Sequence, residues 1–148
     1  DLGPEDEVIV PSFTFCATAT AFARKGARIV LADIDPATMM VTPETLEARL
    51  TSRTRAVVVV HYGGAAAPMA AIKDLCDRHG IVILEDAAQA FGAKQDGRAV
   101  GTCGLFAAYS FHETKIISAG HGGALVLNSD NSHLRERVEE LLARVKVS

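Results

Sequence analysis

Six short apolar runs recur along this chain, and longer stretches with helix signals separate most of them. The runs are EVIV (7–10), RIVLADI (28–34), AVVVVHY (56–62), IVILEDA (81–87), LFAAYSF (105–111) and GALVLN (123–128). Strands that are buried on both faces show such continuous apolar runs, and their alternation with helices is typical of βαβ units. The sequence therefore predicts a buried, parallel sheet with crossover helices.

The stretches between and after these runs carry the helix signals. Residues 14–26 are rich in small residues, residues 42–44 (Thr-Pro-Glu) place proline in a first helical turn, and residues 68–80 end in glycine. We interpret these three as crossover helices. Residues 132–147 predict a further helix, which packs through one apolar face formed by Leu134, Val138, Leu141, Leu142 and Val145.

Length and charge limit the classes of function. The chain has 148 residues, of which 49% are hydrophobic and 22% charged, the composition of one globular domain. Its net charge of -3 offers no basic surface to a nucleic acid or an anionic membrane. No apolar run reaches the roughly 18 residues that span a bilayer, and the first residues are acidic where a signal peptide is basic. We therefore expect a cytoplasmic protein that binds neither nucleic acid nor membrane.

The chain has three cysteines, which point to no site. Cys16, Cys76 and Cys103 are far apart, and their spacing is not that of metal ligands. An odd number of distant cysteines favours reduced, buried thiols over a disulfide framework. We therefore assign them no function and expect no metal site.

Polar residues follow three of the predicted strands. They lie in residues 61–64 (His-Tyr-Gly-Gly), residues 85–89 (Glu-Asp-Ala-Ala-Gln) and residues 110–115 (Ser-Phe-His-Glu-Thr-Lys). In an open α/β sheet, ligands bind outside the carboxyl ends of the strands. We therefore expect the three segments to open onto one crevice.

An acidic residue at one strand end and a lysine after a later strand suit pyridoxal phosphate (PLP), an aldehyde cofactor that is held by a lysine and withdraws electrons from its substrate. Asp86 is placed to keep the pyridine nitrogen protonated, and Lys115 to hold the aldehyde and then move the substrate proton. Ser110 could donate a hydrogen bond to the cofactor phosphate, and Gln89 could bond the phenolic oxygen of the ring.

Each of these residues also has a purely structural interpretation. A lone lysine in a loop is usually a solvated charge, and an aspartate after a strand is usually a turn or helix-cap residue. A glutamine or serine near a strand end commonly bonds the backbone. Only their joint occurrence, in this order, favours a cofactor site at Asp86, Gln89, Ser110 and Lys115.

Several stretches, in this order and spacing, resemble the DegT/DnrJ/StrS sugar aminotransferases of fold type I over nearly the whole chain. They read EDEVIVPSFTFCATA, GARIVLADIDPATMMVTPE, TRAVVVVHYGG, GIVILEDAAQAFGA, GRAVGTCG, YSFHETK and GGALVLN. The resemblance implies a three-layer α/β/α fold with a mostly parallel sheet, of which residues 1–148 form one partial large domain. It also implies that PLP is the cofactor.

The resemblance assigns a role to five residues. Lys115 matches the family's Schiff-base lysine and Asp86 its pyridinium partner, while Gln89 matches the contact to the ring and Ser110 a phosphate ligand. Phe15 matches the aromatic position that stacks on the ring, with a core phenylalanine at a helix start as the alternative.

Within the family, the resemblance is greatest to members that transfer an amino group from glutamate to C4 of a sugar, and it is carried by residues 61–64 (HYGG) together with EDAAQ and SFHETK. The sugar is a nucleotide-linked 4-keto-6-deoxy sugar of the dTDP-4-dehydro-6-deoxyglucose type. Members that act at C3 more often read HLYG at 61–64. The resemblance further implies a homodimer or higher homo-oligomer that completes each active site. His61 and His112 could lie near the sugar, but we favour their interpretation as core or loop histidines that bond backbone carbonyls.

The sequence also departs from the family's usual extent and pattern. Ile116 and His121 stand where the family usually has a small polar residue and a glutamate, and the phosphate-cradling helix start and the small domain are not within residues 1–148. We therefore expect a fragment that lacks activity by itself.

Three other functions compete with this one. The sugar dehydratases of the family have a histidine in place of the lysine, so Lys115 argues against them. A non-enzymatic nucleotide-binding domain would need a glycine-rich phosphate turn such as GxGxxG, which the sequence lacks. An inactive relic of the enzyme remains the third alternative.

Overall fold

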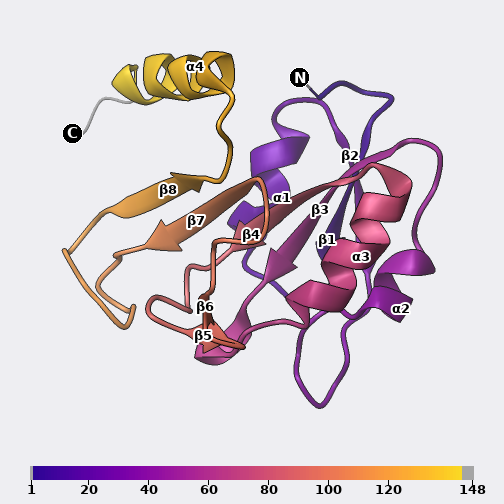
Figure 1. The fold of residues 1–148 in the computed structure, drawn as a ribbon, viewed down its shortest axis with the longest axis horizontal. Helices are drawn as coiled ribbons and strands as arrows, with labels where there is room; N and C mark the ends of the chain where they lie inside the picture. The colour runs from indigo at the N-terminus through magenta and orange to yellow at the C-terminus, as the bar shows by residue number, and fades with distance from the viewer. Residues whose placement is uncertain (1, 145–148) are drawn as a thin grey trace.

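The computed structural model describes residues 2–144, which form a six-stranded sheet with helices on both faces (Figure 1). The strand order is β2-β1-β3-β4-β7-β8. These strands are β1 (Glu7–Pro11), β2 (Arg28–Ala32), β3 (Thr54–Val60), β4 (Val82–Asp86), β7 (Phe106–Ser110) and β8 (Gly123–Leu127). All six apolar runs of the sequence are therefore strands.

The sheet is parallel except at one edge. β1 pairs with β2 and β3, β3 with β4, and β4 with β7, all in parallel, whereas β8 pairs antiparallel with β7. The expectation of a parallel strand is thus wrong for β8. A parallel return needs a crossover of a dozen or more residues, usually through a helix. Residues 111–122 contain no helix, so the chain folds directly back along β7.

The four helices are α1 (Cys16–Ala23), α2 (Pro43–Glu47), α3 (Met69–His79) and α4 (Ser132–Ala143). Before α2, Thr42 caps the helix, because its side-chain oxygen accepts the Thr45 N–H at 3.3 Å. At its other end, α3 stops where Gly80 takes a left-handed φ of 64°. The predicted glycine stop is confirmed.

Alternate residues of the strands serve two separate cores. Val8, Val10 and Val58 pack on the face that α1 covers, together with Phe22. The opposite face buries a larger cluster beneath α2 and α3, which includes Ile9, Val57, Val59, Leu46 and Ile72. Because successive side chains of a strand point to opposite faces, this alternation fixes which layer each residue at a strand end meets.

One helix departs from its expected role. None of the residues of α4 is buried, and Leu141 and Leu142 of its apolar face are 47% and 52% exposed. The expectation that this helix packs on the rest of the chain is therefore wrong for residues 132–143. Val145, also assigned to that face, lies outside the described residues.

The cysteines follow the expectation only in part. Cys76 lies on the buried side of α3, and burial raises the pKa of its thiol to about 11. Burial also raises the pKa of Cys103, which is half-buried. Cys16, the first residue of α1, is exposed, so the expectation of a buried thiol is wrong there.

A candidate cofactor site at the carboxyl edge of the sheet

The three polar segments meet at one edge of the sheet. They follow β3, β4 and β7, which are neighbours in the strand order (Figure 1). The His61 N–H donates to the Asp86 carbonyl at 3.0 Å, and the Ala87 N–H donates to the Ala108 carbonyl at 2.9 Å. The structure thus brings the three segments to one edge of the sheet, and their opening onto one crevice stays a prediction. Two short strands, β5 (Lys94–Gln95) and β6 (Arg98–Ala99), form a separate hairpin in the connection between β4 and β7.

Asp86 is the last residue of β4 and faces the layer of α1. One carboxylate oxygen, Oδ2, accepts a hydrogen bond from the Thr18 hydroxyl at 2.8 Å. The other, Oδ1, accepts the Ala88 N–H at 3.1 Å. A carboxylate oxygen can accept two hydrogen bonds, so each retains an acceptor site. The side chain is only half-buried. Asp86 therefore combines a fixed position with the capacity to accept the N–H of a protonated ring nitrogen.

Ser110 lies on the strand next to Asp86. In the parallel pairing, Asp86 is opposite Ala108, so Ser110, two residues further along β7, points to the same face as Asp86. Its Oγ accepts the His112 N–H at 3.3 Å. A serine hydroxyl also has one proton to donate, which this bond does not use. Ser110 can therefore donate to an anionic oxygen.

Gln89 is oriented by the short 3₁₀ helix η1 (Tyr62–Gly64). The Gly63 N–H donates to the side-chain oxygen Oε1 of Gln89 at 3.0 Å. Gly63 has a φ of 62°, a conformation that favours glycine. Because Oε1 accepts this bond, the amide NH₂ of Gln89 is the group that can donate to a ligand oxygen. The expected contact to a phenolic oxygen needs such a donor.

Lys115 lies in the loop between β7 and β8, where its N–H donates to the His112 carbonyl at 2.9 Å. The residue is half-buried rather than fully solvated, and its ammonium takes part in none of the salt bridges within residues 2–144. The same described residues contain no hydrogen bond between the side chains of Lys115 and Asp86. The amino group is thus uncommitted to an acidic partner.

Phe15 precedes α1 in an extended conformation, and its carbonyl accepts the Thr18 N–H at 3.0 Å. The side chain is 74% exposed. The alternative of a core phenylalanine is therefore wrong. A large exposed aromatic ring beside a site is typical of a surface that a ligand or another chain covers.

Glu85, next to Asp86, is the centre of a buried network that we did not predict. Its Oε2 contacts His61 Nε2 at 2.9 Å and accepts the Gly101 N–H at 2.8 Å. Its Oε1 accepts the N–H groups of Cys103, at 2.7 Å, and Gly104. Burial by itself raises the pKa of Glu85, but the hydrogen bonds from His61, Gly104, Gly101 and Cys103 outweigh burial and hold this pKa below the ordinary glutamate value.

His61 is a fully buried residue of this network. Its Nδ1 accepts the Ala67 N–H at 3.1 Å, so the ring proton is on Nε2 and is donated to Glu85. The interpretation as a core histidine is confirmed, although its partners are a carboxylate and an N–H rather than carbonyls. His112 likewise bonds a side chain, because its Nδ1 lies 3.0 Å from the Thr114 hydroxyl.

A charged residue inside the apolar run IVILED is the signal that could have revealed Glu85.

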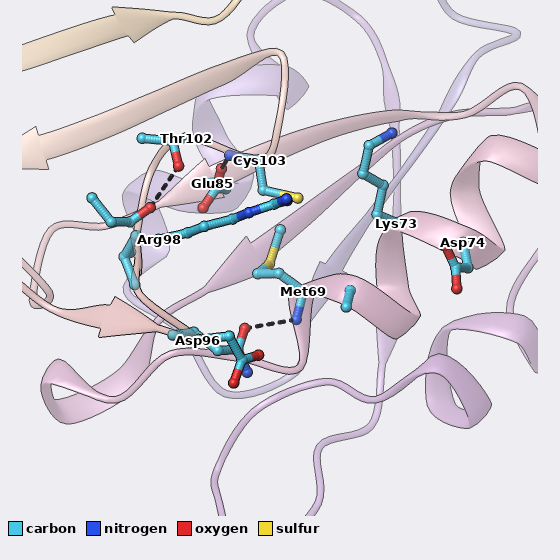
Figure 2. A pocket seen from close by; sticks show the side chains of 12 residues that line it. Met69, Lys73, Asp74, Glu85, Asp96, Arg98, Thr102 and Cys103 are labelled. Atoms are coloured by element: carbon cyan, nitrogen blue, oxygen red, sulfur yellow. Dashed lines mark hydrogen bonds between the residues drawn. The ribbon is translucent and has the colours of Figure 1, made fainter.

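A cavity of about 460 Å³ lies next to Glu85, and Figure 2 shows the side chains that line it. It opens between the start of α3 and the segment that carries the β5–β6 hairpin. Its lining includes Met69, Lys73, Glu85, Gln95, Arg98 and Cys103. Glu85 points to this cavity and Asp86 points away from it, as alternation along β4 requires. The cavity is therefore separate from the candidate cofactor site.

Within residues 2–144, no helix combines the length and the apolar character that crossing a membrane requires. The same part of the chain contains no group of three or more His, Cys, Asp or Glu residues that could hold a metal ion.

Curated relatives cover the chain but extend well beyond it. The chain is 49% identical, over 130 residues, to a pleiotropic regulatory protein of Geobacillus stearothermophilus, a match that covers 87% of this chain and 35% of that protein. It is 42% identical, over 142 residues, to the L-glutamine:2-deoxy-scyllo-inosose aminotransferase of Streptomyces kanamyceticus, covering 96% of this chain and 33% of the enzyme. The chain thus spans about a third of the length of these relatives.

Solved structures share the fold closely. DesV of S. venezuelae, in complex with a ketimine intermediate, matches with a TM-score of 0.88 and 41% identity, over 99% of this chain and 40% of DesV. DesI, solved in the presence of its TDP-sugar product, matches with a TM-score of 0.83 and 41% identity, over 90% of this chain and 34% of DesI.

The sequence also matches the DegT/DnrJ/EryC1/StrS aminotransferase family over residues 1–145. Aminotransferases of this family depend on PLP, and the solved neighbours include one in both a PLP form and a PMP form. The mostly parallel sheet with helices on both faces agrees with PLP fold type I. The chain belongs to the DegT/DnrJ/EryC1/StrS aminotransferase family.

Proposed function

We propose that residues 1–148 form part of the large, cofactor-binding domain of a longer PLP-dependent sugar aminotransferase, in which Lys115 binds the cofactor covalently. The observation that carries the proposal is the position of Asp86, which ends β4 with both carboxylate oxygens held by donors and with acceptor capacity to spare. Ser110 shares its face on the neighbouring strand. Lys115 follows in the loop after that strand.

Each residue has a role that its contacts support. When bound, PLP withdraws electrons from the substrate carbon that loses its proton. The contacts of these residues within the protein leave Asp86 able to accept the N–H of a protonated ring nitrogen, the Gln89 amide able to donate to the phenolic oxygen, and the Ser110 hydroxyl able to donate to the phosphate; each would hold bound PLP in this way. Lys115 holds the cofactor at rest and carries the proton during transfer. Phe15 covers one face of the ring.

For the substrate, we propose a nucleotide-linked 4-keto-6-deoxy sugar that receives the amino group at C4 from glutamate. The resemblance of HYGG at residues 61–64 to the dTDP-4-amino-4,6-dideoxygalactose transaminases supports this substrate. The TDP-sugar product of DesI supports the nucleotide-sugar class. The curated relative named for L-glutamine and 2-deoxy-scyllo-inosose favours a second candidate, which is a glutamine donor with a cyclitol acceptor.

The surroundings of the site lead to a related proposal. Phe13 and Tyr62 pack edge to face with ring centroids 5.1 Å apart, and the rings of these two residues and of Phe15 are at least 36% exposed. We propose that a second copy of the full-length protein covers them in a homodimer or higher homo-oligomer.

The cytoplasmic location stays a prediction, tested by fractionating cells that express the tagged protein.

The substrate proposal is tested by incubating the full-length protein and PLP with each pair of amino donor and keto acceptor. The pairs are glutamate with dTDP-4-keto-6-deoxyglucose and glutamine with 2-deoxy-scyllo-inosose. Nuclear magnetic resonance of the product from dTDP-4-keto-6-deoxyglucose and glutamate should show a new amine at C4. Amination at C3, or turnover only with glutamine and 2-deoxy-scyllo-inosose, would contradict the C4 assignment and leave PLP-dependent amino transfer in place. No turnover with any keto substrate would contradict the proposal that the full-length protein is an aminotransferase.

A further inference from the structure

The hydroxyl groups of two threonines and the Asp86 carboxylate form a continuous chain of hydrogen bonds. Thr18 Oγ1 lies 2.8 Å from Asp86 Oδ2, and Thr14 Oγ1 lies 2.8 Å from Thr18 Oγ1. Thr18 is 8% exposed and belongs to α1, whereas Asp86 ends β4, 68 residues further along the chain. The contact therefore joins a helix to the carboxyl edge of the sheet.

The direction of both hydrogen bonds follows from the carboxylate. An ionised carboxylate only accepts, so Thr18 must give its single proton to Asp86. The oxygen of Thr18 is then free to accept, and Thr14 is the donor. Hydrogen bonds in such a chain polarise one another, and a bond to a charged group is stronger than a neutral one. The proton of Thr18 is therefore committed to Asp86.

The second contact to Asp86 explains why the threonine matters. The terminal torsion of an aspartate is broad, so one hydrogen bond does not fix the plane of its carboxylate. The Ala88 N–H holds Oδ1 from the same loop, and Thr18 holds Oδ2 from a different element. Loss of the Thr18 hydroxyl would leave the carboxylate free to turn about its contact with Ala88.

We propose that Thr18 is a positioning residue that orients the Asp86 carboxylate toward the ring nitrogen of the cofactor. The inference rests on the proposed function, because Asp86 acts only if PLP is bound. Thr18 touches neither cofactor nor substrate in this account. It acts by keeping Asp86 in the one orientation in which the ring nitrogen stays protonated.

The test uses three variants of the full-length protein. Thr18→Val keeps the shape of the side chain and removes the hydroxyl, and Thr18→Ser restores the hydroxyl without the methyl group. Thr20→Val is the matched control, because Thr20 lies on the same helix and its hydroxyl, within residues 2–144, bonds only the Ala17 carbonyl, at 3.4 Å. Nitrogen NMR of bound, isotope-labelled PLP reports the protonation of the ring nitrogen, and steady-state kinetics report kcat and KM.

In Thr18→Val we expect the ring-nitrogen signal to move toward the unprotonated position and kcat to fall about tenfold, with KM for the amino donor within about twofold. Thr18→Ser should restore both readouts, and Thr20→Val should leave both unchanged. An unmoved signal with unchanged kcat in Thr18→Val, or a serine variant as impaired as the valine variant, would overturn the positioning role.

The outcome also separates this inference from the proposed function. If the unmodified full-length protein binds PLP at Lys115 and Thr18→Val is indistinguishable from it, the proposed function stands and the role of Thr18 is wrong. If the unmodified protein binds no PLP at Lys115, the proposed function is wrong and the role of Thr18 falls with it.

Discussion

Glu85 and Asp86 are consecutive on β4, yet they face opposite layers of the sheet. Glu85 contacts buried His61 at 2.9 Å on the side of α3, and Asp86 accepts a hydrogen bond from Thr18 of α1. This division follows from the alternation of side chains along a strand. As a result, the Glu85 carboxylate bonds groups within the core, whereas the Asp86 carboxylate retains acceptor sites for a ligand.

The first prediction concerns Asp86. Asp86→Asn keeps the size of the side chain but removes the charge that stabilises a protonated ring nitrogen. We expect the full-length variant to retain PLP and to lose turnover by on the order of 100-fold, as for removal of one electrostatic group from an active site. Cofactor titration and steady-state kinetics measure the two effects. Asp130→Asn, at an exposed aspartate, is the control, and near-normal turnover in Asp86→Asn would contradict the role.

The second prediction concerns the stability of the Glu85 network. In Glu85→Gln, one side-chain oxygen is replaced by an NH₂ group. Each oxygen of Glu85 serves two donors, so either orientation of the amide leaves two donors without an acceptor. We expect the free energy of unfolding to fall by about 2 to 5 kcal/mol in urea titrations at pH 7. A loss below about 0.5 kcal/mol would contradict the network.

The difference in unfolding free energy between the unmodified protein and Glu85→Gln should also depend on pH. The pKa of Glu85 is lowered in the folded state from an ordinary value of 4.5. Its ionised form therefore stabilises the fold above that value, and this contribution is lost as the pH falls through the lowered pKa. The difference in unfolding free energy between the unmodified protein and Glu85→Gln should narrow below pH 4.5. If this difference in unfolding free energy widened in acid instead, it would contradict a stabilising role for the ionised Glu85 carboxylate.

The strands were predictable because their apolar runs are continuous, as in AVVVVHY, and a buried parallel strand requires this pattern. The direction of β8 was not, because GALVLN has the same composition whichever way it pairs. Similarly, a periodic pattern predicts the helix at 132–143 but does not identify what its apolar face contacts.

The candidate site shows the same limit. The placement of Asp86, Gln89 and Ser110 at one edge of the sheet could be predicted, because Asp86 and Ser110 end strands and Gln89 follows one. Thr18 could not, because a threonine among alanines is ordinary in a helix and its partner is 68 residues away. Glu85 carried a signal, since a charge in an apolar run needs a partner, but the donors at residues 101–104 are defined only by the fold.

A third prediction tests the close approach of the loop at residues 101–104 to β4. A Cβ at Gly104 would lie 2.8 Å from the carbonyl oxygen of Ile83, so the backbone must shift to accommodate it. We expect Gly104→Ala to cost about 1 to 3 kcal/mol in thermal or urea unfolding. Gly3→Ala, whose Cβ would meet only Asp6 at 3.9 Å, should change the stability by less than about 0.5 kcal/mol. Equal effects in the two variants would contradict the tight contact.

A fourth prediction concerns the chain of 148 residues by itself. Within this chain, Ser110 is the one phosphate ligand that we assign, so several charge-assisted hydrogen bonds, worth about 1.5 to 3 kcal/mol each, would be lost relative to a complete site. We expect no measurable aminotransferase activity from the isolated chain and activity from the full-length protein. Robust turnover by the isolated chain, in the product assay described above, would contradict this expectation.

The central claim is that Lys115 holds the cofactor, and mapping the covalent attachment tests it most directly. The full-length protein is loaded with PLP, reduced with borohydride, digested and analysed by mass spectrometry. We predict a PLP adduct on the peptide that contains Lys115, its loss in Lys115→Ala, and its retention in Lys94→Ala, which changes an exposed lysine of β5. An adduct on Lys73 or Lys94, or an undiminished adduct in Lys115→Ala, would contradict the account.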